Sequence, residues 1–234
     1  MKTNVVKQLR ALLLALLILG MGTTIVLAAS RDIVVWDFEG EVLTPSIDEP
    51  AGLGGTPATA QGGPNNGTES FPAGNGSTDA WSFNGWSQSG RDDDIYFQFR
   101  IDLTYFGGMT LYFDDRASST GPQSYDIRYS TDGGTNWTDA ATAQGTHPDF
   151  TASPMNTHSL GIAAGSSDVI VRIYGYGATA STGTWRIDNV RFFATTNENA
   201  VTMNNLAANS TNSFFGLGTA FVFVAGLLIL RKRK

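Results

Sequence analysis

Short segments in which apolar and polar residues alternate recur through the middle of this 234-residue chain. A two-residue period is typical of β-strands that bury one face, whereas helices repeat every 3.6 residues. No helical period occurs between the two apolar ends of the chain. The pattern predicts an all-β domain, an antiparallel β-sandwich of the jelly-roll type. Strands are expected at residues 33–38, 80–83, 95–101, 109–114, 125–130, 169–174 and 183–193.

Composition limits the partners of the predicted domain, which spans residues 30–193. Residues 30–198 contain eight arginines, no lysine and all 21 acidic residues of the chain, a net charge of −13 with histidine neutral. Such a surface argues against a nucleic-acid partner and is compatible with divalent cations. The chain has no cysteine. An exported domain of this sequence would therefore rely on packing, or on a bound metal, in place of disulfides.

Two stretches follow neither period. Residues 41–76 are rich in Gly, Pro, Asn and Thr, and we expect them to form a long irregular surface loop. Residues 194–213 are polar and carry a single charge, which is typical of a flexible stalk. The sequence therefore predicts one folded domain followed by a tether.

The amino-terminal segment predicts export. Lys2, Lys7 and Arg10 precede an apolar run at 11–27, and small residues follow it. This order is typical of a secretory signal peptide, to which we assign residues 1–29. The alternative is an uncleaved amino-terminal anchor. In both cases the domain behind it is expected outside the cytoplasm.

The carboxyl-terminal segment predicts attachment to a membrane. Residues 214–230 form a run of 17 residues without a charge, at the short limit for a transmembrane helix. The basic residues 231–234 follow at once and favour a cytoplasmic end. This order resembles the exosortase-type sorting tails of prokaryotic surface proteins, although neither Pro-Glu-Pro nor Leu-Pro-x-Thr-Gly precedes the helix. A processed tail and a plain single-pass anchor both remain open, and either places the domain at the cell surface.

One hairpin carries a recognisable turn pattern. In YSTDGGTNW, the residues Ser130, Asp132, Gly134 and Trp137 match Ser-x-Asp-x-Gly-x-x-Trp. The stretch resembles an Asp box, a turn in which the Ser and Asp side chains bind backbone amides and the Trp packs beneath. The resemblance implies a structural role for these four residues, in keeping with the behaviour of Asp and Gly in turns.

Residues 36–193 as a whole resemble bacterial and archaeal extracellular jelly-roll modules akin to carbohydrate-binding and MAM-like domains. The stretches WDFE, YFQFRIDL, SSTGPQSYDIRYSTDGG, RIYGYGA and GTWRIDNVRF carry the resemblance. It implies a recognition or adhesion role with a glycan or protein ligand. Sugar binding in such folds uses aromatic rings helped by Arg, Asn and Asp. The candidates that we expect on outward faces and loops are Trp81, Trp86, Tyr96, Tyr112, Arg128, Tyr174 and Tyr176.

Asp188 interrupts the last expected strand. In GTWRIDNVRFF, strict alternation places Asp188 on the same face as Val190 and Phe192. A buried carboxylate needs a partner, because an unpaired buried charge is costly. The partner can be a metal ion, or it can be a salt bridge to Arg186 or Arg31.

The metal alternative follows from the resemblance. The first and last strands of such modules often share a structural calcium ion, bound by an acidic residue of the opening segment and an Asp of the closing one. The matching residues are Glu39 and Asp188, with Asp79 as third ligand and Asp37 as a weaker candidate. Calcium binds about six to eight oxygen atoms, so loop oxygens must complete the set.

An enzyme is the least favoured interpretation. The expected domain offers only His147 and His158, both in loop-like sequence, and no lysine or cysteine. The acidic run at 92–94 precedes a strand and has the character of a solvated turn. We therefore expect a non-catalytic surface module for recognition or adhesion. The alternatives are a structural coat protein and, less favoured, a secreted carbohydrate-active enzyme.

Overall fold

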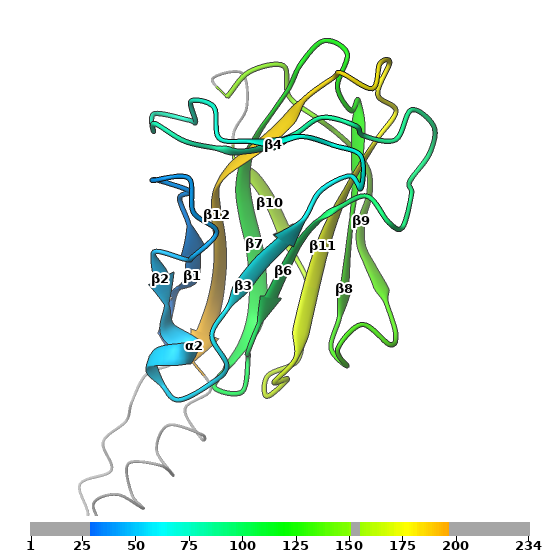
Figure 1. Ribbon diagram of the computed structural model, residues 1–234. Helices are drawn as coiled ribbons and strands as arrows, with labels where there is room; N and C mark the ends of the chain where they lie inside the picture. The colour runs from blue at the N-terminus through cyan, green and yellow to red at the C-terminus, as the bar shows by residue number, and fades with distance from the viewer. Residues whose placement is uncertain (1–28, 151–154, 197–234) are drawn as a thin grey trace, which may run out of the picture.

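The computed structural model describes residues 29–150 and 155–196. Within these residues, two antiparallel sheets pack face to face (Figure 1). Sheet A has the order β10–β7–β12–β1–β2, with β5 on β12 and β4 on β5, and sheet B has the order β3–β6–β11–β8–β9. The predicted antiparallel β-sandwich is confirmed.

The strands have the following bounds. Sheet A contains β1 (Ser30–Trp36), β2 (Ile47–Asp48), β4 (Glu69–Ser70), β5 (Trp81–Phe83), β7 (Phe106–Ala117), β10 (Asn156–Ser159) and β12 (Trp185–Thr196). Sheet B contains β3 (Thr59–Gly62), β6 (Phe97–Ile101), β8 (Ser124–Ser130), β9 (Thr138–Gly145) and β11 (Val169–Tyr176).

Aromatic side chains fill the space between the sheets. Trp81, Trp86 and Trp185 surround Phe97, with ring centroids 4.9, 5.0 and 5.3 Å from it. All four side chains are almost fully buried. Burial of one such side chain stabilises the fold by roughly 2–3 kcal/mol. The apolar half of each alternating strand therefore forms the core, and the polar half is left on the outside of the sandwich.

The stretch at 41–76 is more regular than expected. It contains β2, β3, β4 and a one-turn helix, α2 (Glu49–Gly52). The Asp48 side chain caps this helix by accepting a hydrogen bond from the backbone N–H of Ala51 at 3.2 Å. The prediction of an irregular loop is wrong for these four short elements, and the rest of the stretch is in turns and irregular backbone. Pairing to β1, β6 and β5 orders strands that carry no apolar alternation.

The two ends of the described chain lie side by side. The backbone N–H of Ala29 donates to Thr196 Oγ1 at 3.3 Å, and that of Thr196 donates to the carbonyl of Ala29 at 3.2 Å. Strand β12 extends to Thr196, so the predicted stalk cannot begin at 194. The segments 1–28, 197–213, 214–230 and 231–234, which carry the predicted signal peptide, stalk, anchor and basic end, lie outside the described residues. No helix in the described part of the chain is long and apolar enough to cross a membrane.

Candidate functional site

The outer face of sheet B carries a row of polar side chains that crosses all five strands. Strand register places these residues next to one another, and each is the outward member of an alternating pair. From β3 to β9 the row consists of Gln61, Gln98, Arg172, Arg128 and Asp139. Because the inward residues of β6, β8 and β11 are apolar and buried, this face is a rigid platform for polar groups.

The centre of the row is a stack of rings and guanidinium groups. The guanidinium of Arg172 lies 3.8 Å from the ring centroid of Tyr96 and 4.5 Å from that of Trp137. The guanidinium of Arg128 lies 5.9 Å from the same Trp137 ring. Arg172 Nε donates to Gln98 Oε1 at 2.7 Å, which fixes the plane of the group. Each cation–π contact contributes about 0.5–2 kcal/mol, so the stack holds both rings in place.

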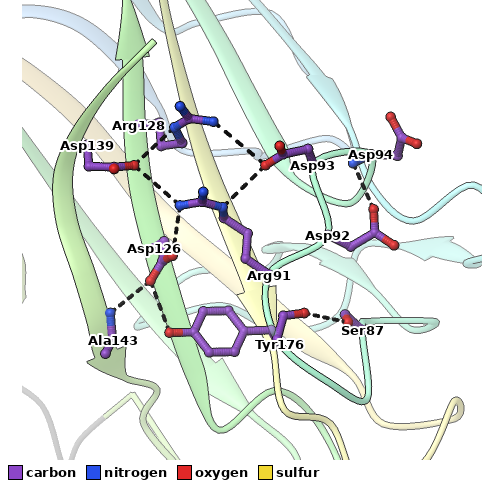
Figure 2. A network of polar contacts seen from close by, with 11 residues as sticks. Ser87, Arg91, Asp92, Asp93, Asp94, Asp126, Arg128, Asp139, Ala143 and Tyr176 are labelled. Carbon is purple, nitrogen blue, oxygen red and sulfur yellow. Dashed lines mark hydrogen bonds and ion pairs between the residues drawn. The ribbon is translucent and has the colours of Figure 1, made fainter.

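Arg91 reaches this face from the loop between β5 and β6. Figure 2 shows its guanidinium between the carboxylates of Asp93, Asp126 and Asp139. The nitrogen–oxygen distances are 3.2 Å to Asp93, 3.0 Å to Asp126 and 3.3 Å to Asp139. Burial opposes the charge of Arg91, but the three carboxylates together raise its pKa. The loop is thereby attached to β8 and β9.

The second oxygen of Asp126 and the second arginine of this network also have partners. Asp126 Oδ1 accepts hydrogen bonds from the Tyr176 hydroxyl at 3.0 Å and from the backbone N–H of Ala143 at 2.8 Å (Figure 2). Arg128 forms ion pairs with Asp139 at 3.0 Å and with Asp93 at 3.7 Å. Two arginines therefore neutralise most of the charge of three carboxylates at this end of the face.

Sheet B brings together only part of the predicted ligand-binding set. Tyr96, Arg128 and Tyr176 lie on its outer face and are partly buried. Tyr174 lies on the same face but is 1% exposed, because Arg91 lies over its ring at 5.6 Å and the Tyr96 ring contacts it at 5.7 Å. Burial raises the pKa of the Tyr174 hydroxyl. Tyr174 therefore supports the face and is not available to stack on a sugar.

The other three candidates lie elsewhere. Trp81 and Trp86 are 0% and 2% exposed in the core, so their expected place on an outward face is wrong. Strand β5 is buried along its whole length, which the sequence alternation does not reveal. Tyr112 lies on the outer face of sheet A, where it contacts the Phe193 ring at 6.2 Å and Arg191 at 5.5 Å.

Trp137 is the functional candidate that sequence reasoning missed, because the turn pattern gave it a structural role only. The Ser130 hydroxyl accepts from the backbone N–H of Gly134 at 2.8 Å, and Asp132 Oδ1 accepts from that of Asn136 at 2.9 Å. Ser130 and Asp132 thus bind backbone amides within the turn. Trp137 Nε1 donates to the Gly134 carbonyl at 2.9 Å, and its ring lies over the Arg172 stack. Its partial exposure, next to an outward arginine, is what marks it as a surface residue.

The puzzle of Asp188 is resolved by a β-bulge in β12. The ladder to β7 passes from the pair Asp188–Asp114 to the pair Arg191–Tyr112, so β12 has one residue more than its partner. Asn189 has a φ of 49°, a left-handed conformation that asparagine tolerates better than most residues. The bulge therefore contains Asn189.

The extra residue reverses the alternation of inward and outward side chains. Trp185 and Ile187 are core residues before the bulge, and Val190 and Phe192 are core residues after it. Asp188 therefore lies on the opposite side from all four. The expectation that Asp188 is in line with Val190 and Phe192 is wrong.

Asp188 is fully buried beneath the loop 74–79, which covers this part of sheet A. Its Oδ2 accepts hydrogen bonds from the backbone N–H of Asn75 and the hydroxyl of Ser77, both at 2.7 Å, and Oδ1 accepts from the N–H of Asn189 at 2.7 Å. A Cβ atom at Gly74 would lie 2.3 Å from Asp188 Oδ2, so only glycine permits this approach. Burial, with a further contribution from Asp114, raises the pKa of Asp188 despite the three donors.

The salt-bridge alternative for Asp188 is also wrong. Arg186 Nη1 donates to the carbonyl of Ala73 at 2.9 Å, and Arg31 pairs with Glu49 at 3.1 Å. Asp188 is held by neutral N–H and O–H donors.

The same loop contacts one of the other predicted metal ligands, Glu39, and contains the other, Asp79. Glu39 accepts from the backbone N–H of Thr78 at 3.0 Å and from its hydroxyl. Asp79 Oδ2 accepts from the N–H of Gly40 at 3.0 Å. In the described residues, no three Asp, Glu, His or Cys side chains converge where they could hold one metal ion. The loop thus brings Glu39, Asp79 and Asp188 into one neighbourhood, but their carboxylates alone do not form a ready metal cage.

Both histidines of the domain belong to a separate buried network between the sheets. Asp115 accepts from Trp185 Nε1 at 2.8 Å and lies 2.5 Å from His147 Nδ1. The Tyr125 hydroxyl lies 3.0 Å from His158 Nε2. Burial, with help from Asp115, raises the pKa of Tyr125, and burial lowers that of His158. The network satisfies polar groups inside the sandwich and joins β8 to sheet A.

No protein-family model matches the chain, and the comparison with curated proteins gives no match. Among solved structures, the chain is similar to the CBM22-1 xylan-binding domain of Xyn10C from Paenibacillus barcinonensis, with 10% identity, 71% of this chain and 96% of that chain covered, and a TM-score of 0.43. It is also similar to the K3 adhesin domain of Lys-gingipain from Porphyromonas gingivalis, with 16% identity, 70% of this chain and 99% of that chain covered, and a TM-score of 0.40. A third similar structure is TmCBM61, solved with β-1,4-galactotriose, with 15% identity, 59% of this chain and 89% of that chain covered, and a TM-score of 0.35. The function of this chain is accordingly inferred from its own side chains.

Proposed function

We propose that the chain is a non-catalytic glycan-binding module that binds its ligand across the outer face of sheet B. The observation that carries the proposal is the combination of Tyr96, Trp137 and Tyr176 with the polar row on one face. Aromatic rings stack on the apolar faces of sugars, while arginine, glutamine and aspartate side chains bond to hydroxyl groups. Because the row crosses all five strands, it can contact several sugar residues of one chain.

The face is ordered before any ligand binds. Arg172 packs against two rings, and Arg91 ties the loop before β6 to three carboxylates. A preformed surface loses little side-chain entropy on binding, which favours affinity. The protein would therefore bind glycans through a rigid platform.

A glycan-array screen of the full-length chain, followed by titration calorimetry on the hits, tests the proposal. Trp137→Ala and Tyr96→Ala should each weaken binding by about tenfold or more, as for aromatic residues at the centre of an interface. Tyr112→Ala, which removes an aromatic residue from the outer face of sheet A, is the matched control and should leave binding unchanged. Loss of binding in Tyr112→Ala but not in Trp137→Ala would move the site to sheet A. Absence of any glycan ligand would overturn the proposal.

We further propose that a calcium ion stabilises the loop 74–79 against sheet A. The support is electrostatic: among the described residues, no arginine or histidine forms an ion pair with Glu39, Asp79, Asp114 or Asp188. These carboxylates lack a positively charged partner, and a divalent cation with oxygen ligands would supply it. Glu39 and Asp188 would supply carboxylate oxygens, and backbone carbonyls of the loop would have to supply others.

Calorimetry with calcium, before and after EDTA, tests this second proposal. Calcium at a hundredfold excess over its Kd should stabilise the full-length chain by about 3 kcal/mol. Asp188→Asn and Glu39→Gln should abolish the effect, whereas Asp92→Asn, in an exposed turn, should not. An identical melting temperature with calcium and with chelator would exclude the site.

We propose display at the cell surface as the setting for this function. The support is the predicted signal peptide and anchor, together with the adjacent ends of the folded domain, from which one stalk would present the sandwich. Protease added to intact cells should remove the domain. A domain that stays protected inside the cell would contradict the assignment.

A further inference from the structure

Arg172 occupies the centre of the outer face of sheet B. It lies on β11, the middle strand, with Gln98 of β6 on one side and Arg128 of β8 on the other. Arg172 and Arg128 are thus directly opposite each other in the ladder. Like charges at opposed positions destabilise a sheet. Arg172 contributes the cation–π stack, but two like charges opposite each other in the ladder still call for an explanation.

The other arginines of this face are paired with carboxylates. Arg91 contacts three of them, Arg128 contacts Asp139 at 3.0 Å, and Arg100 contacts Asp168 at 2.5 Å. Arg172 forms no ion pair with any residue that the structure describes. Its own contacts are Gln98, the hydroxyl of Tyr174 and the two aromatic rings, all of them neutral. One positive charge without an ion-pair partner among the described residues therefore lies at the middle of the platform, in a domain whose overall charge is strongly negative.

We propose that Arg172 binds a carboxylate of the ligand, so that the glycan recognised by this face is an acidic one that contains uronic acid residues. The inference rests on the function proposed above and names its ligand class. A planar guanidinium bonds a carboxylate through two parallel N–H groups, and such charge-assisted bonds are stronger than bonds to a sugar hydroxyl. The rings of Tyr96 and Trp137 lie against the group, where they would contact the sugar that carries the carboxylate.

A merely structural Arg172 is the rival explanation. The cation–π stack would then serve only to position the two rings, and the ligand would be neutral. The two explanations differ in one measurable quantity, the ratio of affinities for a uronate oligosaccharide and for its methyl ester. Esterification removes the charge and preserves the rest of the molecule.

The test uses the full-length chain and a panel of oligogalacturonate, oligomannuronate, heparosan and glucuronoxylan fragments, each as free acid and as methyl ester, in 50 mM salt. For at least one glycan, the affinity for the free acid should exceed the affinity for its ester by about tenfold or more. Arg172→Gln should bring this ratio close to one. Arg172→Lys should give an intermediate ratio, since lysine keeps the charge without the planar fork. Arg116→Gln, at an exposed position on β7 of sheet A, should leave the ratio unchanged.

The outcomes separate the ligand class from the site. One outcome is that neutral glycans bind, that Trp137→Ala lowers their affinity, and that no acid binds more tightly than its ester. This outcome overturns the acidic-ligand inference, while the sheet B site stands. An acid preference that survives in a folded Arg172→Gln variant also overturns it. If no glycan of either kind binds, both proposals fail. A preference that disappears with Arg172→Gln, while the thermal melt of the variant stays cooperative, supports the inference.

Discussion

Two groups of carboxylates in this sandwich are satisfied in opposite ways. The Asp188 site consists of Asp188, Asp114, Glu39 and Asp79. Its carboxylates accept hydrogen bonds from amide and hydroxyl donors of the loop 74–79, of the bulge and of Gly40. The Arg91 network, made of Arg91, Arg128, Asp93, Asp126 and Asp139, pairs its carboxylates with two guanidinium groups. Both groups attach a long loop to a sheet, but only the second neutralises its charge.

The difference shows on which sheet the charge of the carboxylates is neutralised by the protein's own side chains. Neutral donors stabilise a carboxylate without cancelling its charge, so the Asp188 site keeps a negative field that a cation would relieve. The Arg91 network has nearly balanced charge and needs no ion. The comparison therefore supports the two proposals made above, a calcium ion at the sheet A site and an organic ligand on sheet B. The three predictions below test that division.

Asp188→Ala should give the largest effect. The substitution leaves the buried donors of Asn75, Ser77 and Asn189 without their acceptor. Each unpaired buried donor costs on the order of 1–3 kcal/mol, and relief of the buried charge offsets part of the sum. We expect a net loss of about 2–3 kcal/mol in the free energy of unfolding at neutral pH, measured by urea denaturation.

Asp92→Ala provides the control for this loss. Asp92 is exposed and accepts one bond, from the backbone N–H of Asp94 at 3.0 Å. Its replacement should change stability by no more than about 0.5 kcal/mol. Equal effects of the two substitutions would mean that the loop 74–79 is not held by Asp188, and the contrast between the two carboxylate groups would be lost.

The strands with a clean two-residue period were predictable from the sequence, whereas the short strands at the sheet edges were not. Strands β6, β7, β8 and β11 each place apolar residues into the core at every second position along part of their length, so these residues predict both the strand and its inner face. Strands β3, β9 and β10 consist of small and polar residues at or near sheet edges, where one partner strand and little burial are enough. Such strands are fixed by their neighbours, which a local pattern does not record.

The candidate site was predictable in part for the same reason. Tyr96, Arg128 and Tyr176 were found because they are the polar or outward members of alternating pairs. Trp137 was missed because it follows a turn rather than a strand pattern. The bulge at Asn189 was missed because one left-handed residue reverses the faces of a strand without changing its composition.

Arg91→Gln should give an intermediate effect that depends on salt. Asp126, whose side chain is 10% exposed, would lose its ion partner but keep its bonds from Tyr176 and Ala143. We expect a loss of about 1–2 kcal/mol in the free energy of unfolding at low ionic strength. Asp93 and Asp139 are 68% and 51% exposed, and 1 M salt shortens the screening length to about 3 Å, so the loss should shrink there.

The salt response distinguishes the two groups. The loss caused by Asp188→Ala should be the same at low and high salt, because hydrogen bonds to buried neutral donors are little screened. Arg31→Gln is a second control, since its single pair with Glu49 is largely exposed and should contribute less than about 1 kcal/mol. A salt-independent loss in Arg91→Gln would show that packing of the loop, and not charge pairing, dominates there.

The substitution Asp132→Asn should have the smallest effect on stability. It separates the contribution of hydrogen-bond donors to a carboxylate's pKa from the contribution of burial. Asp132, like Asp188, is bound by neutral donors: the backbone and side-chain amides of Asn136, and the Ser130 hydroxyl. Those bonds lower the pKa of Asp132 to about 2, whereas burial raises the pKa of Asp188. A lowered pKa in the folded state means that Asp132 adds stability above its unfolded pKa of about 3.8 and loses it as the pH falls through about 2.

Asp188 responds to pH with the opposite sign. Its raised pKa favours the protonated form in the folded state, so its contribution weakens as the pH rises through that pKa. Melting temperatures of Asp132→Asn and the unmodified chain, recorded from pH 6 to pH 2, should therefore differ most at pH 6 and converge near pH 2. The Asp188→Asn curve should not converge in this way. A pH-independent difference for Asp132→Asn would mean that the amide replaces the carboxylate as an acceptor, and that the charge of Asp132 adds nothing to the turn.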